Sequence, residues 1–235
     1  MKIFDCTQFV GKPDAATMEK EFGFFPAVCP NESDLCLPGG VAGQRFVDVQ
    51  KVEKIAASAY QSREILILDI EDQNGRENVE IAISAVKASK PGLQVGAWGY
   101  LPAMGPQASE VLRYPWSLKA WLELQASNLP AISAADFLFP SFYSTGNVHE
   151  DSALQAIAFL WVRNQPVCAG KSLYPFLSNR IAGLSYGAPL GKDLIWNSLG
   201  NCRDHADGCV LWSNPGEPWD PSSDFIQMAK IFAKM

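Results

Sequence analysis

Basic residues and histidine are scarce in this sequence. Only 19% of its 235 residues are charged, two are histidine, and acidic residues outnumber basic ones by 25 to 19, which gives a formal net charge of −6. No cluster of lysine and arginine stands out along the chain. Because nucleic acids and anionic membrane surfaces both need such a basic patch, we expect no nucleic-acid partner and no membrane partner.

Several sequence motifs are missing as well. No apolar run approaches the length of a membrane span. The chain has neither glycine-rich phosphate-binding motif and no G-x-S-x-G elbow, which argues against nucleotide cofactors and serine hydrolases. Its cysteine and histidine spacing does not match a zinc site. We therefore expect no cofactor and no metal.

The composition is that of a folded domain. Hydrophobic residues make up 48% of the chain, more than a disordered chain contains. No Gly/Ser linker, proline-rich hinge or charge run divides it. We therefore expect residues 1–235 to form one domain, which acts as a monomer.

The cysteines favour an exported protein. The two pairs Cys29/Cys36 and Cys202/Cys209 share the same seven-residue offset, which suits small disulfide-closed loops. Disulfides belong to oxidising compartments. We expect disulfide bonds in a secreted or periplasmic protein whose signal peptide is not in this chain. Buried free thiols and a cytoplasmic location are the alternative.

Short apolar runs alternate with helical patterns, as in βα units around a parallel sheet. The expected strands are Lys2–Cys6, Phe22–Val28, Ile65–Ile70, Gln94–Trp98, Asp136–Phe142, Ser172–Phe176 and Gly208–Trp212. The expected helices are Val47–Tyr60, Asn78–Ser89, Ser152–Arg163, Lys192–Leu199 and Asp224–Ala233. This pattern predicts an α/β fold, a (β/α) barrel of the TIM type that is distorted or seven-stranded.

Polar and aromatic residues follow most of these strands. In a parallel barrel all such strand ends meet at one rim, where active sites lie. The residues expected there to bind substrate are Asp5, Gln8, Trp98, Tyr100, Tyr143, Tyr174, Trp212 and Asn214. Aromatic rings can stack on the apolar faces of sugars, and polar groups can bind the hydroxyls. The set therefore indicates a carbohydrate site.

Two acidic residues end the most apolar strand. Asp69 and Glu71 are two positions apart, so their side chains leave a strand on the same face. Two neighbouring carboxylates resist being ionised together, and one keeps its proton to higher pH. Cleavage of a glycosidic bond needs such a proton donor, so we expect Asp69 and Glu71 to be the catalytic pair.

Four short motifs, in order along the chain, resemble those of the hyaluronidases, glycoside hydrolase family 56. Asp69-Ile70-Glu71 is similar to the D-x-E of that family, and Trp98-Gly99-Tyr100 to its W-G-[FY]-Y segment. Phe139-Pro140-Ser141-Phe142-Tyr143 resembles F-P-S-[VI]-Y, and Val210-Leu211-Trp212-Ser213 resembles V-L-W-G-S. A weaker similarity links Leu68-Asp69-Ile70-Glu71, with Asp5, to the family 25 lysozymes.

The hyaluronidase resemblance implies a single catalytic barrel and a retaining mechanism assisted by the substrate. In it, Glu71 is the acid and then the base, and Asp69 orients the N-acetyl group that attacks the anomeric carbon. Tyr143 and Trp212 line the acetamido pocket, and Tyr100 lines the cleft. The resemblance thus predicts a glycoside hydrolase that cleaves a polysaccharide at N-acetylhexosamine residues.

Two other functions fit the same residues. A polysaccharide lyase would use Tyr143 or Tyr100 as the base that removes a proton beside a uronate carboxylate. A carbohydrate-binding barrel would use the aromatic residues without any turnover.

Overall fold

The computed structural model describes residues 1–38, 45–62, 64–71, 75–100, 111–112, 114–181 and 187–235. Its centre is a six-stranded parallel sheet with the order β6-β5-β2-β1-β10-β9. These strands are β1 (Lys2–Cys6), β2 (Phe24–Val28), β5 (Ile65–Leu68), β6 (Val95–Ala97), β9 (Phe176–Ser178) and β10 (Gly208–Trp212). Five of them match segments predicted from the sequence, and β9 begins at Phe176, where the predicted strand Ser172–Phe176 was expected to end.

A short seventh strand closes this sheet into a barrel. β7 (Phe137–Leu138) pairs in parallel with β8 (Ser172–Leu173), which continues into β9. Single bridges then join Trp98 to Phe139 and Ser141 to Phe176, one on each side of the gap. Pro140 and Pro175 interrupt the two strands here because proline has no N–H for the ladder. The predicted barrel is therefore confirmed, with seven strand positions around it.

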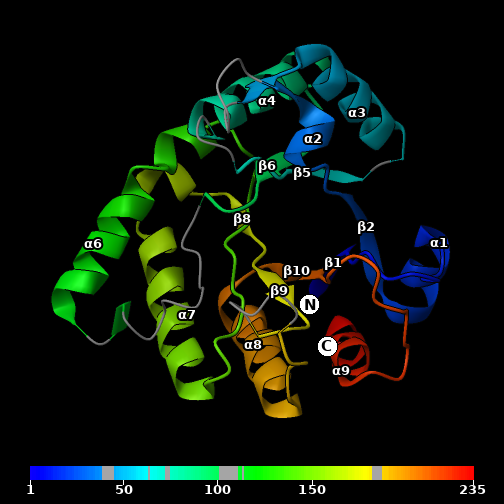
Figure 1. The fold of residues 1–235 in the computed structure, drawn as a ribbon, viewed down its shortest axis with the longest axis vertical. Helices are drawn as coiled ribbons and strands as arrows, with labels where there is room; N and C mark the ends of the chain where they lie inside the picture. The colour runs from blue at the N-terminus through cyan, green and yellow to red at the C-terminus, as the bar shows by residue number, and fades with distance from the viewer. Residues whose placement is uncertain (39–44, 63, 72–74, 101–110, 113, 182–186) are drawn as a thin grey trace.

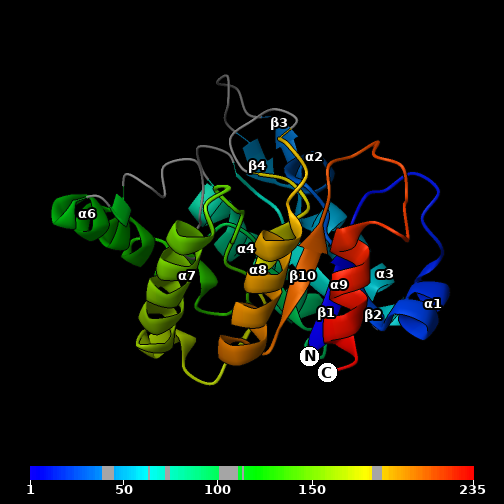
Figure 2. The same cartoon turned by 90° about the horizontal axis from the view of Figure 1, so that it is seen from below.

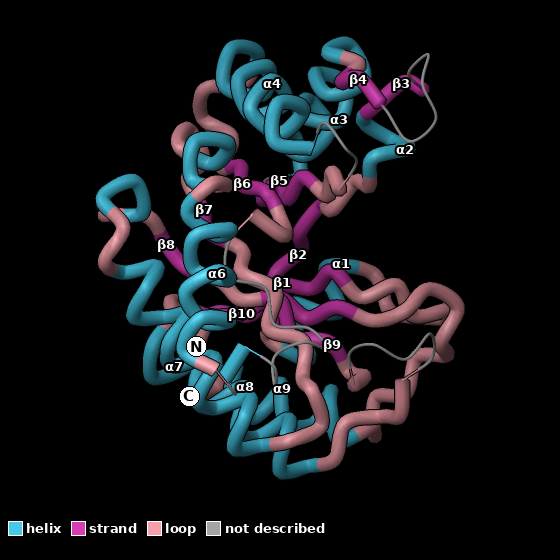
Figure 3. Tube along the Cα trace, turned by 60° about the vertical axis from the view of Figure 1, so that its left-hand side comes forward, coloured by secondary structure: helices cyan, strands magenta, loops and turns pink. Residues whose placement is uncertain are grey.

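The helices lie outside this ring of strands, as Figure 1 and Figure 3 show. The long ones are α3 (Val49–Ser62), α4 (Gly75–Ser89), α6 (Pro115–Ala126), α7 (Val148–Arg163), α8 (Lys192–His205) and α9 (Asp224–Ala233). All five predicted helices are among them, and α6 is an addition. No helix in the described ranges has both the length and the apolar character needed to cross a bilayer.

Shorter elements lie between the long strands and helices. They are α1 (Ala15–Thr17), the π-helix η1 (Met18–Phe22), α2 (Glu32–Leu35), the antiparallel pair β3 (Cys36–Pro38) and β4 (Arg45–Val47), η2 (Leu129–Ile132) and η3 (Pro166–Cys168). Both chain termini lie at the end of the barrel opposite β3 and β4 (Figure 2). Since β1 starts at that end, β3 and β4 mark the rim where the strands finish.

Aromatic side chains fill the inside of the barrel. Phe4, Phe137, Phe139, Tyr174 and Phe176 are all at most 5% exposed and meet mostly edge to face. A second apolar layer packs the outer faces of the strands against the helices. The interior is therefore a packed core rather than a pore.

Gly96 on β6 is required by this packing. A Cβ at this position would lie 2.5 Å from the carbonyl oxygen of Phe137 and 2.6 Å from the ring of Phe139. Only a residue without a side chain leaves room for that ring. The small residue thus lets the aromatic layer cross the barrel.

The disulfide prediction is wrong, because all six cysteines are free thiols in the structure. Cys202 lies on α8 and Cys209 on β10, both fully buried in the layer between helix and sheet. Burial raises the pKa of both thiols. The equal spacing of the pairs was misleading, and the argument for export that rested on it loses its support.

Candidate active site

Asp69 and Glu71 stand where β5 ends at the rim. The backbone N–H of Asp69 donates to the carbonyl of Pro30 (3.2 Å), and Asp69 bridges Asn31, so β5 stays paired to the chain after β2. Ile70, between them, is fully buried in the outer layer. The alternation of the strand therefore turns both carboxylates to the other face, as predicted.

The two carboxylic acids hold their protons unusually well. Burial raises the pKa of Asp69 to about 6, and the nearby Glu32 adds to the shift. Partial burial at the rim raises the pKa of Glu71 to about 7, with further contributions from Asp69 and Glu32, although Glu71 keeps contact with solvent. At neutral pH Asp69 is therefore mostly ionised, while Glu71 carries a proton in about half of the molecules.

Glu32 is a third acid that the sequence reasoning missed. It begins α2, and its Oε2 accepts the backbone N–H of Glu71 (3.2 Å) while its Oε1 pairs with Arg45 (3.2 Å). Asn31 caps the helix through its side chain, which accepts from the N–H groups of Ser33 and Asp34. Glu32 follows the second strand within a few residues, so the strand-end rule applied to β2 would have found it.

Three aromatic side chains gather beside the pair. Tyr143 stacks on Trp212 with ring centroids 5.7 Å apart and lies 6.1 Å from Trp98. Burial, then Asp69, raises the pKa of the Tyr143 phenol well above its ordinary range, so the group stays protonated. The structure thus brings together Tyr143 from the segment after β7, Trp98 from the position after β6, and Trp212 from the end of β10.

The indole N–H of Trp98 is buried and has no hydrogen-bond acceptor. A buried donor left without a partner destabilises the folded protein by about 1–3 kcal/mol. Proteins rarely leave such groups unpaired, and functional sites are where they do. The Trp98 ring lies beside those of Tyr143 and Phe176.

Asp5 lies differently from the prediction, whereas Gln8 is at the rim. Asp5 is 8% exposed and faces away from the barrel interior, where its carboxylate accepts from Thr7 (2.9 and 2.6 Å) and pairs with Lys12 (3.0 Å). It holds the loop after β1 and is not part of the acidic pair. Gln8 is exposed at the rim, and its backbone N–H donates to Ser213 (2.9 Å).

Tyr100 and Tyr174 do not join the site either. Gly99 turns the chain with a φ of +80°, and the Tyr100 hydroxyl then donates to the carbonyl of Ile70 (2.5 Å) in the outer layer. Tyr174 packs within the aromatic core of the barrel. Tyr100 departs from the strand-end rule because of the turn at Gly99, and Tyr174 because β9 runs on to Ser178, which places it inside the barrel and not at a strand end.

Asn214 keeps the predicted place. It is half-buried and follows Trp212 by two residues, on the same side of the chain after β10. Ser213 between them is fully buried. Asn214 therefore remains a candidate for binding sugar hydroxyls beside Trp212.

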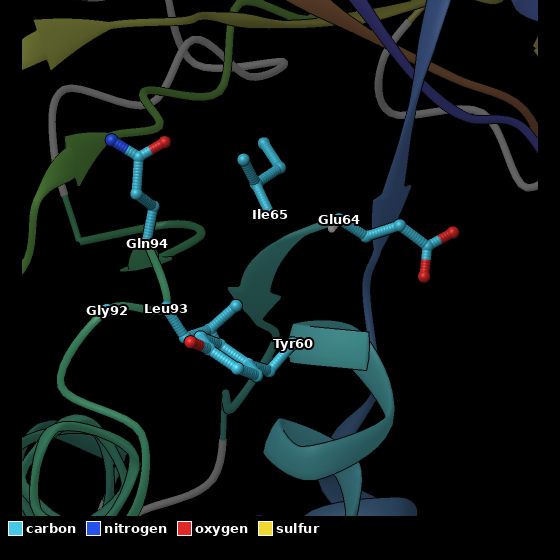
Figure 4. A pocket seen from close by; sticks show the side chains of 6 residues that line it. All are labelled: Tyr60, Glu64, Ile65, Gly92, Leu93 and Gln94. Carbon is cyan, nitrogen blue, oxygen red and sulfur yellow. The ribbon is translucent and has the colours of Figure 1, made fainter. Parts of the chain in front are cut away.

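A hollow of about 450 Å³ lies at the other end of β5 and β6. Tyr60, Ile65, Leu93 and Gln94 line it, and Glu64 points away from the others (Figure 4). It contains no pair of acids and lies at the start of the strands, where barrel enzymes place stabilising residues and not catalytic ones. Within the described ranges, no three His, Cys, Asp or Glu side chains converge as metal ligands.

Solved structures of other proteins share this architecture. No protein-family model matches the chain, and no curated protein matches it. Bee venom hyaluronidase is 12% identical with a TM-score of 0.61, over 91% of both chains. The structure of bee venom hyaluronidase in complex with a hyaluronic acid tetramer is 13% identical with a TM-score of 0.58, over 98% of this chain and 93% of that one.

Two fungal β-1,4-galactanases are also similar, at 10% identity and a TM-score of 0.50, over 99% of this chain and 86% of theirs. At such low sequence identity, the similarity is evidence for the fold alone. The resemblance predicted from the four motifs is confirmed at that level: the chain has the barrel fold of glycoside hydrolases and is distantly similar to hyaluronidase.

Proposed function

We propose that the protein is a retaining glycoside hydrolase that cleaves a polysaccharide at N-acetylhexosamine residues. The observation that carries this proposal is the pair of acids at the end of β5, with pKa values raised to about 6 and about 7. Groups that must donate and accept protons near neutral pH need such values.

Glu71 has the properties of the proton donor. With a pKa of about 7 it is protonated in about half of the molecules at neutral pH, and it keeps access to solvent. It would donate its proton to the glycosidic oxygen as the bond from that oxygen to the anomeric carbon breaks. Its carboxylate would later take a proton from the water that attacks the same carbon.

Asp69 is the orienting partner. The lower pKa leaves it ionised when Glu71 is still protonated. Its carboxylate would accept the N–H of the acetamido group at C2, whose carbonyl oxygen attacks the anomeric carbon and forms a cyclic oxazolinium ion. Water then opens this ring, so that the acetamido group is restored and the anomeric configuration is retained.

The aromatic side chains support a sugar as the ligand. Trp212 and Tyr143 are partly exposed and stacked, and Trp98 lies beside Tyr143. Flat rings suit the apolar faces of a pyranose. The geometry suits a lyase less well, because the surroundings of Tyr143 keep its phenol protonated and a base must be able to lose that proton.

Product analysis tests the proposal. Chitin oligomers, glycosaminoglycans, peptidoglycan and alginate should be incubated with the protein and assayed for new reducing ends and for ultraviolet absorbance. Reducing ends without absorbance are expected for at least one polymer. Absorbance from a new double bond would indicate a lyase, and binding without any product would indicate a carbohydrate-binding barrel. Either result would refute the proposal.

A further inference from the structure

We propose that the substrate is an uncharged or positively charged aminopolysaccharide, a chain of N-acetylhexosamine that is intact or partly N-deacetylated, and not an acidic glycosaminoglycan. This inference rests on the proposed function and specifies its substrate class. It is carried by the distribution of charge around the barrel rim.

The negative charge of the protein is concentrated in one part of its fold. The segments in question connect the end of each barrel strand to the next long helix or to α1, and they cover 7–14, 29–48, 69–74, 98–114, 139–147, 179–191 and 213–223. Their described residues include eight acidic and only three basic ones, a formal charge of −5. The other described residues include 15 acidic and 14 basic ones and are close to neutral. In a parallel barrel the segments that follow the strands form the rim that carries the candidate site.

The basic residues of these segments are already paired. Their described members are Lys12, which pairs with Asp5 (3.0 Å), Arg45, which pairs with Glu32 (3.2 Å), and Arg180, which pairs with Glu217 (3.0 Å). Arg180 also donates to the carbonyl of Gly187 (3.0 Å). Three cations lie in the first turns of the helices that follow: Lys51 on α3, which donates to the carbonyls of Ser33 and Cys36 (3.4 and 3.3 Å), exposed Arg76 on α4, and Lys192 on α8, which pairs with Asp224 (3.2 Å).

In the described part of the chain, the charged groups that shift the pKa values of the reacting acids are themselves acidic. Glu32 raises the pKa of Asp69, and Asp69 and Glu32 raise that of Glu71. A uronate carboxylate bound in this place would meet this negative charge, while the described basic side chains of the rim segments are already paired. Repulsion between like charges lowers the affinity for an unsuitable ligand, just as attraction between opposite charges raises the affinity for a suitable one. Sugar hydroxyls, acetamido groups and ammonium groups meet no such repulsion.

Three oligosaccharides of equal length isolate the effect of charge: a chitin hexamer, its partly deacetylated form and a hyaluronan hexamer. Reducing-end release by the wild-type protein and calorimetric binding to Glu71→Gln should be measured at 20 mM and 500 mM salt. At low salt we expect kcat/KM and affinity for hyaluronan to be at least about tenfold below those for chitin. High salt should reduce the difference between hyaluronan and chitin, and it should weaken binding of the deacetylated oligomer.

A charge variant makes the test specific. Glu217→Gln leaves Arg180 without its acidic partner and should raise affinity for the hyaluronan hexamer several-fold at low salt. Glu80→Gln makes the same change on the exposed face of α4, away from the rim, and should not. Equal effects of the two variants, or hyaluronan cleaved as well as chitin, would overturn the inference while leaving the hydrolase intact. Failure of all three oligomers to bind and to be cleaved would refute the proposed function itself.

Discussion

Replacing Asp69 by asparagine should stabilise the protein at neutral pH. Its carboxyl group has a pKa of about 6 in the folded protein against an ordinary 3.8, so the ionised form is disfavoured by folding. A shift of about two units corresponds to about 3 kcal/mol. Because the side chain is partly exposed, screening reduces this value, and we expect a gain of about 1–2 kcal/mol in the free energy of unfolding.

The effect should depend on pH in a defined direction. A carboxyl group whose pKa is raised by folding binds more protons in the folded state between pH 4 and 6, so stability falls as pH rises through that range. The difference between Asp69→Asn and wild type should therefore be small at pH 4 and reach its full size above pH 6. Below pH 4 the wild-type group is protonated in both states.

Urea unfolding followed by tryptophan fluorescence at pH 4, 5, 6, 7 and 8 measures this difference. Glu80→Gln, which neutralises an exposed carboxylate on α4, is the matched control and should show no gain of this size. The reasoning would be refuted if Asp69→Asn lost stability at pH 7, or if its gain were the same at every pH.

Three further outcomes follow from the structure. The rate of hydrolysis should peak between about pH 6 and 7, because activity needs ionised Asp69 and protonated Glu71; a rate that keeps rising to pH 9 would contradict this. Gly96→Ala should lower the free energy of unfolding by about 1–3 kcal/mol, since its Cβ would meet the Phe139 ring, and urea unfolding measures it. Tyr143→Phe should reduce kcat/KM by about 10-fold, because the phenol that lines the proposed acetamido pocket would lose one hydrogen bond to the substrate. Full activity of that variant would show that the hydroxyl takes no part in the reaction.

The fold was predictable because its strands and helices have clear patterns. The run from Ile65 to Leu68 is apolar at every position, and the helix starting at Asp224 has a clean apolar face. The end of an apolar run also predicts where its strand ends, and this placed Asp69 and Glu71 at the end of β5. The segments around the prolines were predicted less well: the strand before Pro140 is shorter than expected, and the strand after Pro175 runs on to Ser178 instead of ending at Phe176.

The parts of the site that could not be predicted depend on side-chain direction. Asp5 follows the strand-end rule in sequence, but its neighbours Thr7 and Lys12 draw it out of the barrel. Tyr100 leaves the interior because Gly99 adopts a positive φ, which no periodicity reveals. The free cysteines show the same limit, since equal spacing says nothing about whether two thiols meet.

The most direct test of the account is the turnover of Glu71→Gln. Glutamine keeps the size of the side chain but cannot donate a proton, so we expect product release from a cleaved oligosaccharide to fall by about 10²- to 10⁴-fold. Affinity for that oligosaccharide, measured by calorimetry, should stay within a few-fold of wild type. A variant that binds equally well and turns over at the wild-type rate would show that Glu71 is not the acid, and the central claim would fall.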